Sequence, residues 1–390
     1  MPARLVRSVP LLFLALLLPL TACDLLYWTE DSAEIPGAEV LYQGPNGDRP
    51  NSITALPNGA LVVAGFTNAR LGPVDQVLSI PLLLRVSPDG HITDTTVYRY
   101  VDDGEVTGAV PHRDGLAVFL QEQSYDQETP DLPNATFYHT APTGERMTTL
   151  FQQTDAFLPR RPPHRTSDGG FLLVLSPSGD HPDELVKLNS EGTVAWRNQR
   201  SGLRSAVEVA GGDIVVLNRK DSRRYDLTRL SPSGQEQWQR TYGNDTLRRP
   251  AAVAPTGDGA AVLGTRSVPN SAEDQIVVTR VDRAGDVLWK RTYARGTVSA
   301  TAITALPDGG LAIGYALRER ETGPQRSYVV RLAPDGKEQW RRRFGPRAGS
   351  PHVNALAVRP DGTIIAAGST GRQPRWAPSG DLLVVSYDVE

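Results

Sequence analysis

The sequence contains few side chains whose type and spacing could support catalysis. Neighbouring carboxylates occur at Asp102 and Asp103 and at Asp180 and Asp183, and paired carboxylates can serve as the acid and the base of a hydrolase. No G-x-S-x-G, H-E-x-x-H or phosphate-binding glycine loop is present. The carboxylates keep open an enzyme that acts on a saccharide or a small molecule, but they form no complete catalytic constellation.

Metal and cofactor sites have equally few candidate ligands. His164 and His352 both fall near the start of a strand that is expected to face the centre of the molecule, but a metal site needs further converging ligands. Cys23 is the only cysteine, so disulfides within the chain are excluded and a Cys/His zinc site is disfavoured. The sequence has no clustered D-x-D-x-D calcium loop. We therefore expect neither a metal nor a cofactor.

One stretch could be mistaken for an anion site. Residues 332–345 read LAPDGKEQWRRRFG, and Arg341, Arg342 and Arg343 follow Trp340 directly. Arginine side chains bind phosphate and carboxylate groups in a fork-like manner. On a strand, however, successive side chains point to opposite faces, so the three arginines cannot form one clamp. The corresponding positions elsewhere in the chain read RNQ, QRT and KRT, which assigns the stretch to a repeat.

Seven copies of one unit make up most of the chain. The clearest copies are ITALPNGALVVAGFT (53–67), ITALPDGGLAIGYAL (303–317) and NALAVRPDGTIIAAGST (354–370). Each copy contains a turn glycine, and successive glycines are 43 to 56 residues apart: Gly59, Gly115, Gly169, Gly212, Gly259, Gly309 and Gly362. A period near fifty is typical of repeated supersecondary units that bury a shared core.

A second element follows each copy except the last, as in VVRLAPDG (329–336). A cation or histidine precedes its turn glycine by five residues, at Arg85, His139, Lys187, Arg229, Arg280 and Arg331. A tryptophan follows the turn glycine by four residues in four units, at Trp196, Trp238, Trp289 and Trp340. Another aromatic residue follows by eight, at Tyr98, Tyr242, Tyr293 and Phe344. We expect Trp340 and Phe344 to pack between neighbouring units.

These patterns predict four strands in each unit. Asp-Gly and Ser-Gly between apolar runs are tight-turn sequences, because glycine accepts a positive φ and Asp or Ser closes the turn. The second strand is apolar on both faces, for example LVVAGF and TIIAAG, so both of its faces should be covered. The sequence therefore predicts an all-β fold, a single seven-bladed β-propeller of four-stranded antiparallel blades.

The two ends of the repeat region complement each other. The last unit stops at DLLVVSYDVE, its third strand, whereas residues 37–52 begin with what looks like an unattached fourth strand. We expect this N-terminal strand to complete the last blade, three strands plus one, and so to close the ring and remove its exposed edges. The propeller then spans residues 37–390.

The N-terminus has the pattern of an export signal. Arg4 and Arg7 precede the apolar run PLLFLALLLPL, which is too short to span a bilayer comfortably, and LTAC ends at Cys23. This ending resembles a bacterial lipobox, in which the cysteine is acylated. We expect a lipoprotein signal peptide at 1–22, a lipid anchor on Cys23 and a short tether at 23–36. An ordinary secretory signal with an incidental cysteine is the alternative.

The D-G-x-x-x-W element and the glycine-rich second strand resemble the repeats of quinoprotein-like (PQQ-like) β-propellers, over essentially residues 39–390. With the lipobox, the chain also resembles propeller lipoproteins of the cell envelope, including one in the outer-membrane barrel-assembly machinery that usually has eight blades. The resemblance implies an outer-membrane or cell-surface location rather than the inner membrane. Quinoprotein dehydrogenases commonly use a vicinal cysteine pair and a Ca²⁺ site, so the single cysteine disfavours PQQ binding.

Recognition should lie on the face that carries the long connections, because variable loops on a regular scaffold are where binding is usually built. The connections between second and third strands are long, and the links between units emerge on the same face. Candidate contact residues there are Arg160, Arg161, Arg165, Arg223, Arg224, Arg248, Arg249, Arg320 and Trp376. A mixed-charge soluble surface and a basic patch for an anionic partner both remain open.

Charge and composition narrow the function further. The formal net charge is −3, so the chain has no overall basic excess that would indicate nucleic-acid binding. Our leading hypothesis is a monomeric, non-catalytic binding or scaffolding lipoprotein that recognises a protein or a glycan. The alternatives are the extracytoplasmic enzyme with loop carboxylates and a subunit of an outer-membrane assembly complex.

Overall fold

The computed structural model describes residues 38–42, 47–71, 76–98, 103–123, 133–140, 147–154, 156–157, 162–177, 181–221, 224–243, 249–268, 270–318, 323–346, 349–370 and 380–388. In these ranges the regular elements are antiparallel strands, which form five separate sheets and one seven-stranded sheet. None of the described segments is a helix long and apolar enough to cross a membrane. The predicted signal peptide 1–22, Cys23 and the tether 23–36 lie outside the described residues.

The first three sheets follow the order of the chain. The first sheet contains β2 (Asp48–Ala55), β3 (Leu61–Leu71), β4 (Gln76–Val86) and β5 (Ile92–Val97). The second contains β6 (Asp103–His112), β7 (Gly115–Gln123), β8 (Pro133–Thr140) and β9 (Met147–Thr154). The third contains β10 (Ala156–Phe157), β11 (His164–Arg165), β12 (Phe171–Pro177), β13 (Asp183–Leu188) and β14 (Val194–Arg200).

The remaining strands complete the ring. The fourth sheet contains β15 (Leu203–Glu208), β16 (Ile214–Arg219), β17 (Arg224–Leu230) and β18 (Glu236–Gly243). The seven-stranded sheet contains β19 (Arg249–Thr256), β20 (Gly259–Ser267), β21 (Asp274–Val281), β22 (Val287–Ala305), β23 (Leu311–Arg318), β24 (Arg326–Leu332) and β25 (Glu338–Phe344). The last sheet contains β26 (His352–Val358), β27 (Ile364–Ser369), β28 (Leu382–Tyr387) and β1 (Ala38–Tyr42).

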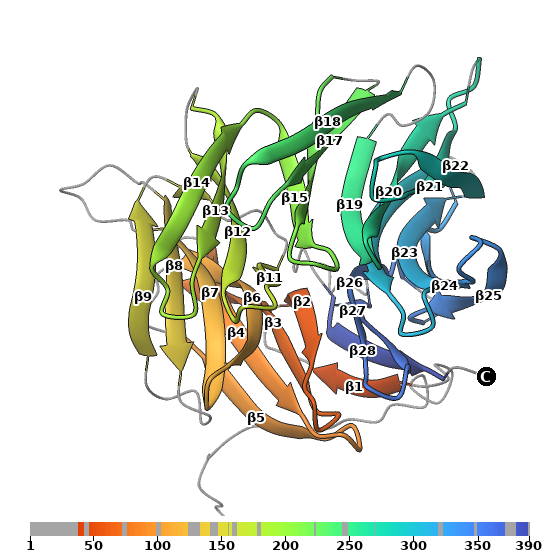
Figure 1. Cartoon of the computed structure of the whole chain (residues 1–390). Helices are drawn as coiled ribbons and strands as arrows, with labels where there is room; N and C mark the ends of the chain where they lie inside the picture. Colours follow the sequence, from red (N-terminus) through yellow and green to blue (C-terminus); the bar gives the residue numbers. More distant parts are fainter. Residues whose placement is uncertain are drawn as a thin grey trace, which may run out of the picture.

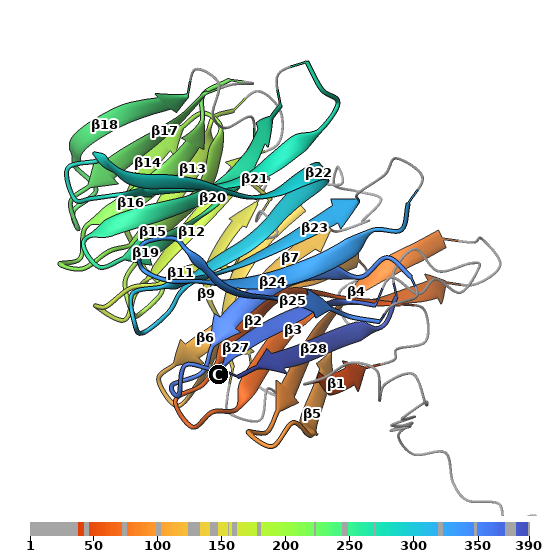
Figure 2. The ribbon, with the colours of Figure 1, turned by 90° about the vertical axis from the view of Figure 1, so that its right-hand side faces the viewer.

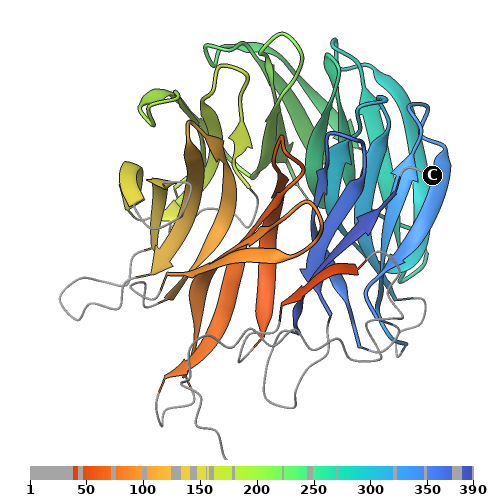
Figure 3. The same cartoon turned by 90° about the horizontal axis from the view of Figure 1, so that it is seen from below.

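The sheets follow one another around a centre, and the last sheet lies beside the first (Figure 1). Strand β1, from the N-terminal end of the described chain, pairs antiparallel with β28, with Tyr42 opposite Leu382 (Figure 3). Ile53, Leu61 and Leu82 of the first sheet share a buried cluster with Ile365 and other side chains of the last sheet. The fold is thus a β-propeller of small antiparallel sheets, with its first and last sheets in contact.

Seven clusters of buried hydrophobic side chains are found among the described residues. Six of them combine strands from two successive sequence repeats, and the seventh combines the first repeat with the last. This arrangement explains why the second strand of each repeat is apolar on both faces. Alternate side chains of one strand enter the clusters on either side; Val62 and Val63 of β3, for example, belong to different clusters.

The glycine in the second strand makes room for an irregular inner strand. Strand β2 has a register shift between Pro50 and Ser52, where it passes Gly65 of β3. A Cβ added at Gly65 would lie 2.0 Å from the carbonyl oxygen of Arg49. The same relation recurs in the last sheet, where a Cβ at Gly368 would lie 1.8 Å from the carbonyl oxygen of His352. A side chain at either position would require the inner strand to move.

The repeated aromatic residues bind the turn of the next repeat. The indole N–H groups of Trp196, Trp238 and Trp289 donate to the carbonyl oxygens of Pro232, Arg283 and Pro334, at 2.9, 3.1 and 3.0 Å. The hydroxyl groups of Tyr242 and Tyr293 likewise donate to the carbonyl oxygens of Gly285 and Gly336. These positions therefore hold neighbouring repeats together at the outer strands.

The stretch 332–345 has the structural role that the repeat predicted. Phe344 is fully buried, and Trp340 packs against the same cluster between β24, β25 and the last sheet. Arg341 donates to Glu338 at 2.7 Å, Arg342 lies over the Trp340 ring, and Arg343 donates to the Pro346 carbonyl at 2.9 Å. The three guanidinium groups thus have separate partners.

The expectation of separate four-stranded sheets fails at one place. Strand β22 is 19 residues long; its first part pairs with β21 as far as Gly296, and its second part pairs with β23 from Thr297 onward. The fourth strand of one repeat thus continues into the first strand of the next. The segment has no proline to remove a backbone donor, so nothing in it terminates strand pairing.

Two further differences concern single repeats. The first strand of the third repeat is divided into β10 and β11, because Pro162 and Pro163 before β11 have no N–H to donate. The sequence predicts a long connection between the second and third strands of each repeat, and in the first repeat this is residues 67–81. The segment is largely a hairpin, since β3 extends to Leu71 and β4 begins at Gln76. This hairpin projects beyond the neighbouring strands (Figures 2 and 3).

Candidate binding surface

Two faces of the propeller differ in their connections. The short-turn face carries tight turns such as Leu56–Ala60 and Ser87–His91, each closed by backbone hydrogen bonds between the two terminal residues. The long-connection face carries the opposite strand ends, for example the end of β16 at Arg219 and the start of β17 at Arg224.

A cavity of about 450 Å³ lies along the axis, bounded by the first strands of the repeats. Its polar lining residues are Asn51, His164, Ser205, Thr301, Thr304 and Asn354, and the others are aliphatic or proline. Among the described residues that line it, none carries a carboxylate, ammonium or guanidinium group. Carboxylate-based hydrolysis would therefore need side chains other than those found in this wall.

The two asparagines of this wall form hydrogen bonds between sheets. The amide nitrogen of Asn354 donates to the carbonyl oxygen of Pro50 at 2.8 Å, which connects the last sheet to the first. The amide nitrogen of Asn51 donates to Glu105 and to the carbonyl oxygen of Val106, both at 3.1 Å, which connects the first sheet to the second. Both side chains lie at register shifts of the inner strands, so the irregular positions are used here for contacts between sheets.

His164 lines the axial cavity, as its sequence position predicted, whereas His352 is exposed and contacts Gln325 at 2.6 Å. Burial lowers the pKa of His164, and Lys187 nearby lowers it further while Glu208 opposes the change. No group of three or more His, Cys, Asp or Glu residues in the described ranges could hold a metal ion.

The carboxylates considered for catalysis have backbone partners where they are described. Asp103 accepts the Ser79 amide at 2.9 Å. Asp183 accepts the Leu203 amide and the Ser176 hydroxyl, both at 2.8 Å. These bonds connect neighbouring strands and sheets, and neither side chain lines the axial cavity. Asp102 and Asp180 lie outside the described residues.

Arg165 occupies a different face from the one expected. It lies beside the tight turn Thr166–Gly170 and lines a second cavity, of about 590 Å³, at the short-turn end of the axis. Pro57, Pro111, Pro307 and Pro360 line the same cavity. β10 pairs with the Ser176–Pro177 end of β12, on the long-connection side, whereas β11 has only two residues before the turn and Arg165 pairs with Phe171 at the opposite end.

Two of the predicted arginines are placed on the long-connection face. Arg224 begins β17, and its Nε and backbone amide donate to Asp221 at 2.6 and 2.8 Å. Arg249 begins β19, lies opposite Thr265 and is exposed. The other candidates lie outside the described residues: Arg160, Arg161, Arg223, Arg248, Arg320 and Trp376.

The cations that recur before the second turn are structural in three repeats. Arg229, Arg331 and Lys187 pair with Asp213, Asp308 and Asp168 at 2.8, 2.6 and 2.7 Å. Each cation has less than a tenth of its side chain exposed. Their partners belong to the other short turn of the same repeat, so these cations are occupied within the scaffold.

The pair of Lys187 and Asp168 changes the pKa of the Asp168 carboxyl group. Partial burial raises this pKa, but hydrogen bonds from Lys187 and Thr166 outweigh burial and lower it to about 2. The carboxylate therefore stays ionised over the physiological pH range and keeps the buried ammonium compensated.

A third cavity, of about 320 Å³, lies on the long-connection face where the end of β14 meets the fourth sheet. We call it the seam cavity, and its lining residues are Arg200, Ser201, Asn218, Arg219, Lys220, Asp226 and Gln239. Residues 218–226 form one of the long connections that the sequence predicts between a second and a third strand, but nothing in the sequence pointed to Arg200 or Gln239. The only linear signal was the adjacent cations Arg219 and Lys220.

Comparison with known proteins supports the repeat architecture. Residues 139–309 match the family model described as Outer membrane protein assembly factor BamB. This segment covers the third to fifth repeats, so the chain contains a BamB-like, PQQ-like propeller segment. A comparison with curated proteins finds no match.

Several solved structures are distantly similar to this chain. The β-propeller domain of the Trilobed protease from Pyrococcus furiosus has a TM-score of 0.47 and 9% identity, over 74% of this chain and 82% of that chain. A Pyrococcus horikoshii acylaminoacyl peptidase has a TM-score of 0.46 and 9% identity, over 75% and 46%. A putative 6-phosphogluconolactonase from Bacteroides fragilis has a TM-score of 0.47 and 10% identity, over 85% and 99%.

Proposed function

We propose that the protein is an envelope-anchored, non-catalytic binding or scaffolding lipoprotein that recognises its partner through the long-connection face. The observation that carries this proposal is the match of residues 139–309 to the outer-membrane assembly factor model. It favours a protein partner, as in an assembly complex, over a glycan. The lipid on Cys23, the outer-membrane or cell-surface location and the monomeric state are parts of the same proposal.

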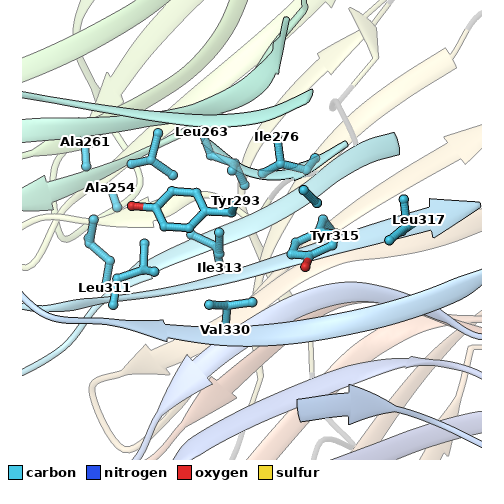
Figure 4. Close-up of a cluster of buried hydrophobic side chains, with 13 residues drawn as sticks. Ala254, Ala261, Leu263, Ile276, Tyr293, Leu311, Ile313, Tyr315, Leu317 and Val330 are labelled. Atoms are coloured by element: carbon cyan, nitrogen blue, oxygen red, sulfur yellow. The ribbon is translucent and has the colours of Figure 1, made fainter. Parts of the chain in front are cut away.

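The scaffold that we propose has seven blades, with the seven-stranded sheet counted as two. The change of partner of β22 at Gly296 and Thr297 supports this count. So does the cluster in Figure 4, where Tyr293 of β22 lies among Ala254, Leu263, Leu311 and other side chains from β19, β20 and β23. Strands of one continuous flat sheet would not cover one another in this way.

The axial cavity supports a binding role more than a catalytic one. Its described wall lacks charged groups, and its two asparagines are used to tie sheets together. Asp103 and Asp183 accept backbone amides away from it. An enzyme with two converging acids at the channel mouth has no support from the described residues.

Anchoring is tested by replacing Cys23 with Ser in the full-length chain. The proposal predicts that the wild-type protein sediments with membranes and that Cys23→Ser moves it to the soluble fraction. Continued sedimentation of the variant would contradict lipidation at this cysteine.

Partner recognition is tested by crosslinking in the native envelope, mild detergent extraction and affinity purification of the tagged chain. The proposal predicts recovery of an outer-membrane protein in stoichiometric amount. Recovery of the chain alone at every crosslinker length would contradict a scaffolding role.

A further inference from the structure

The seam cavity brings together groups from two sheets and from four separate segments of the chain. Arg200 and Ser201 come from the end of the third sheet, while Asn218, Arg219, Asp226 and Gln239 come from the fourth. The strand register places Asn218 opposite Asp226, and Asp226 opposite Thr241, so these three side chains share one face of the fourth sheet. The amide of Arg219 donates to the carbonyl oxygen of Gly202 at 2.7 Å, which closes the seam behind the cavity.

Two charged groups in the cavity already have full sets of partners. Asp226 is 7% exposed and accepts hydrogen bonds from Gln239 at 3.0 Å and Thr241 at 2.6 Å. The three donor nitrogens of Arg200 bind Asn198, Thr228 and Glu236, each at 3.0 Å. Neither group needs a ligand, and both hold the cavity in shape.

Three other groups have hydrogen-bond donors or acceptors that the described residues do not use. The Nε of Arg219 donates to the carbonyl oxygen of Asp221 at 3.3 Å, but its terminal nitrogens have no hydrogen-bond partner among the described residues. Lys220 is exposed and donates to Thr241 at 3.0 Å, which uses one of its three donors. Asn218 is only 7% exposed, and its Oδ1 is a buried acceptor without a donor.

The electrostatic balance of the cavity is positive. Arg200, Arg219 and Lys220 line it with one carboxylate, Asp226. Glu236 pairs with Arg200 at 3.0 Å and Asp226 lies 3.6 Å from Lys220, so the positive charge that is left over is that of Arg219. A fitting ligand must supply a negative charge for Arg219 and Lys220 and a hydrogen-bond donor for Asn218. Leaving a buried acceptor unpaired is costly, so the donor matters as much as the charge.

We infer that the seam cavity binds the carboxylate of an Asp or Glu side chain from a protein partner, and that an adjacent backbone N–H of that partner donates to Asn218. The inference rests on the proposed function, because it assumes a protein partner on the long-connection face. A peptide supplies both groups at close spacing. The volume, about 320 Å³, is at the lower end for ligand pockets and suits one anchoring residue of a partner better than an oligosaccharide.

The test uses fluorescence anisotropy with a labelled decapeptide of alternating Glu and Gly, and a control peptide with Gln in place of Glu. The protein variants are Arg219→Gln and Lys220→Gln, and the matched control is Arg283→Gln. Arg283 is 69% exposed on the short-turn side, so its replacement changes net charge equally at a distant place. All three side chains are exposed, so the variants should fold; circular dichroism checks this.

We expect the Glu peptide to bind and the Gln peptide not to bind at low ionic strength. Arg219→Gln should weaken binding about tenfold, Lys220→Gln somewhat less, and Arg283→Gln less than twofold. No binding of the Glu peptide, equal binding of both peptides, or equal losses in Arg219→Gln and Arg283→Gln would overturn the inference. The inference would also be overturned if trigalacturonate bound more tightly than the Glu peptide and lost its binding in Arg219→Gln. The ligand would then be a uronate and not a protein carboxylate.

Failure of this inference is distinguishable from failure of the proposed function. Envelope crosslinking with the Arg219→Gln chain should recover less partner than the wild type. Equal recovery of the partner with the wild-type and the Arg219→Gln chains would leave the scaffolding role intact. It would show that the seam cavity does not contribute to partner binding. No partner from either chain would reject the scaffolding role, and with it the inference.

Discussion

Arg229 and Arg219 are ten residues apart in the sequence and occupy opposite kinds of site. Arg229 is 1% exposed, pairs with Asp213 at 2.8 Å and donates to the carbonyl oxygen of Asp258 at 2.6 Å. Arg219 is exposed at the end of β16, and its terminal nitrogens have no partner among the described residues. Arg229 stands at a repeat position and Arg219 does not. The repeat position thus uses the Arg229 guanidinium within the scaffold, whereas Arg219 keeps donors for a partner.

The largest effect should come from breaking the buried pair. Arg229→Met removes the guanidinium that binds buried Asp213 at 2.8 Å and leaves only the more distant, exposed Arg283 at 3.9 Å. This should cost about 3–5 kcal/mol of unfolding free energy. Arg219→Met, at an exposed position, should change it by less than about 0.5 kcal/mol. Urea titration followed by tryptophan fluorescence measures both. Similar losses of unfolding free energy in the two variants would contradict the distinction between a structural Arg229 and an available Arg219.

The next effect concerns the close approach of the second strand to the inner strand. Gly368→Ala forces a Cβ against the carbonyl oxygen of His352, and overpacking of this kind should cost about 3 kcal/mol. At Gly211 an added Cβ meets nothing within 4 Å, but φ is +90°, so Gly211→Ala should cost about 1 kcal/mol from backbone strain alone. The same titration tests the order; a larger loss at Gly211 would contradict the role given to Gly368.

A smaller effect should come from one hydrogen bond between repeats. Trp238→Phe removes the N–H that binds the carbonyl oxygen of Arg283 at 3.1 Å, with a loss of about 1 kcal/mol beyond that from packing. In the described part of the chain the indole nitrogen of Trp340 is buried without an acceptor, so Trp340→Phe is the matched control and should cost less. Thermal unfolding compares them, and a greater loss at Trp340 would argue against this bond as a link between repeats.

The smallest effect is a dependence of stability on pH. His112 is 2% exposed and packs against Phe137 and Phe171. Burial lowers its pKa, the charges of Arg113, His139 and Arg165 add to the effect, and Glu191 opposes it.

The unfolded chain therefore binds the proton at a higher pH than the folded one, and stability should fall as pH drops through the ordinary value of 6.5. His112→Phe should lessen the loss between about pH 7 and about pH 5. An unchanged pH profile in urea titrations would show that His112 does not contribute.

Much of the scaffold follows from local sequence. Turn glycines such as Gly59 and Gly336 have φ of +83° and +81°, and the aromatic positions after the second turn bind the next repeat as their spacing suggested. Closure by the strand near Tyr42 was also predictable, because the last repeat lacked a fourth strand. The continuity of β22 was harder to foresee, since it depends on the absence of a breaking residue.

The candidate site was less accessible to sequence reasoning. The seam cavity forms only when Arg200 of one sheet meets Asn218 and Gln239 of the next, and those contacts depend on strand register and on packing between sheets. Arg165 was assigned to the wrong face because the length of β11, two residues, decided which end of the axis it reached. Composition and spacing contain neither piece of information.

Site-specific photo-crosslinking in the native envelope tests most directly whether the long-connection face binds the partner. A photoreactive phenylalanine analogue replaces Lys220, exposed on the long-connection face, or Asp335, exposed in the turn between β24 and β25 on the short-turn face. We predict a discrete crosslinked species at position 220 and none at position 335. Crosslinking at 335 without crosslinking at 220 would contradict the assignment of recognition to the long-connection face.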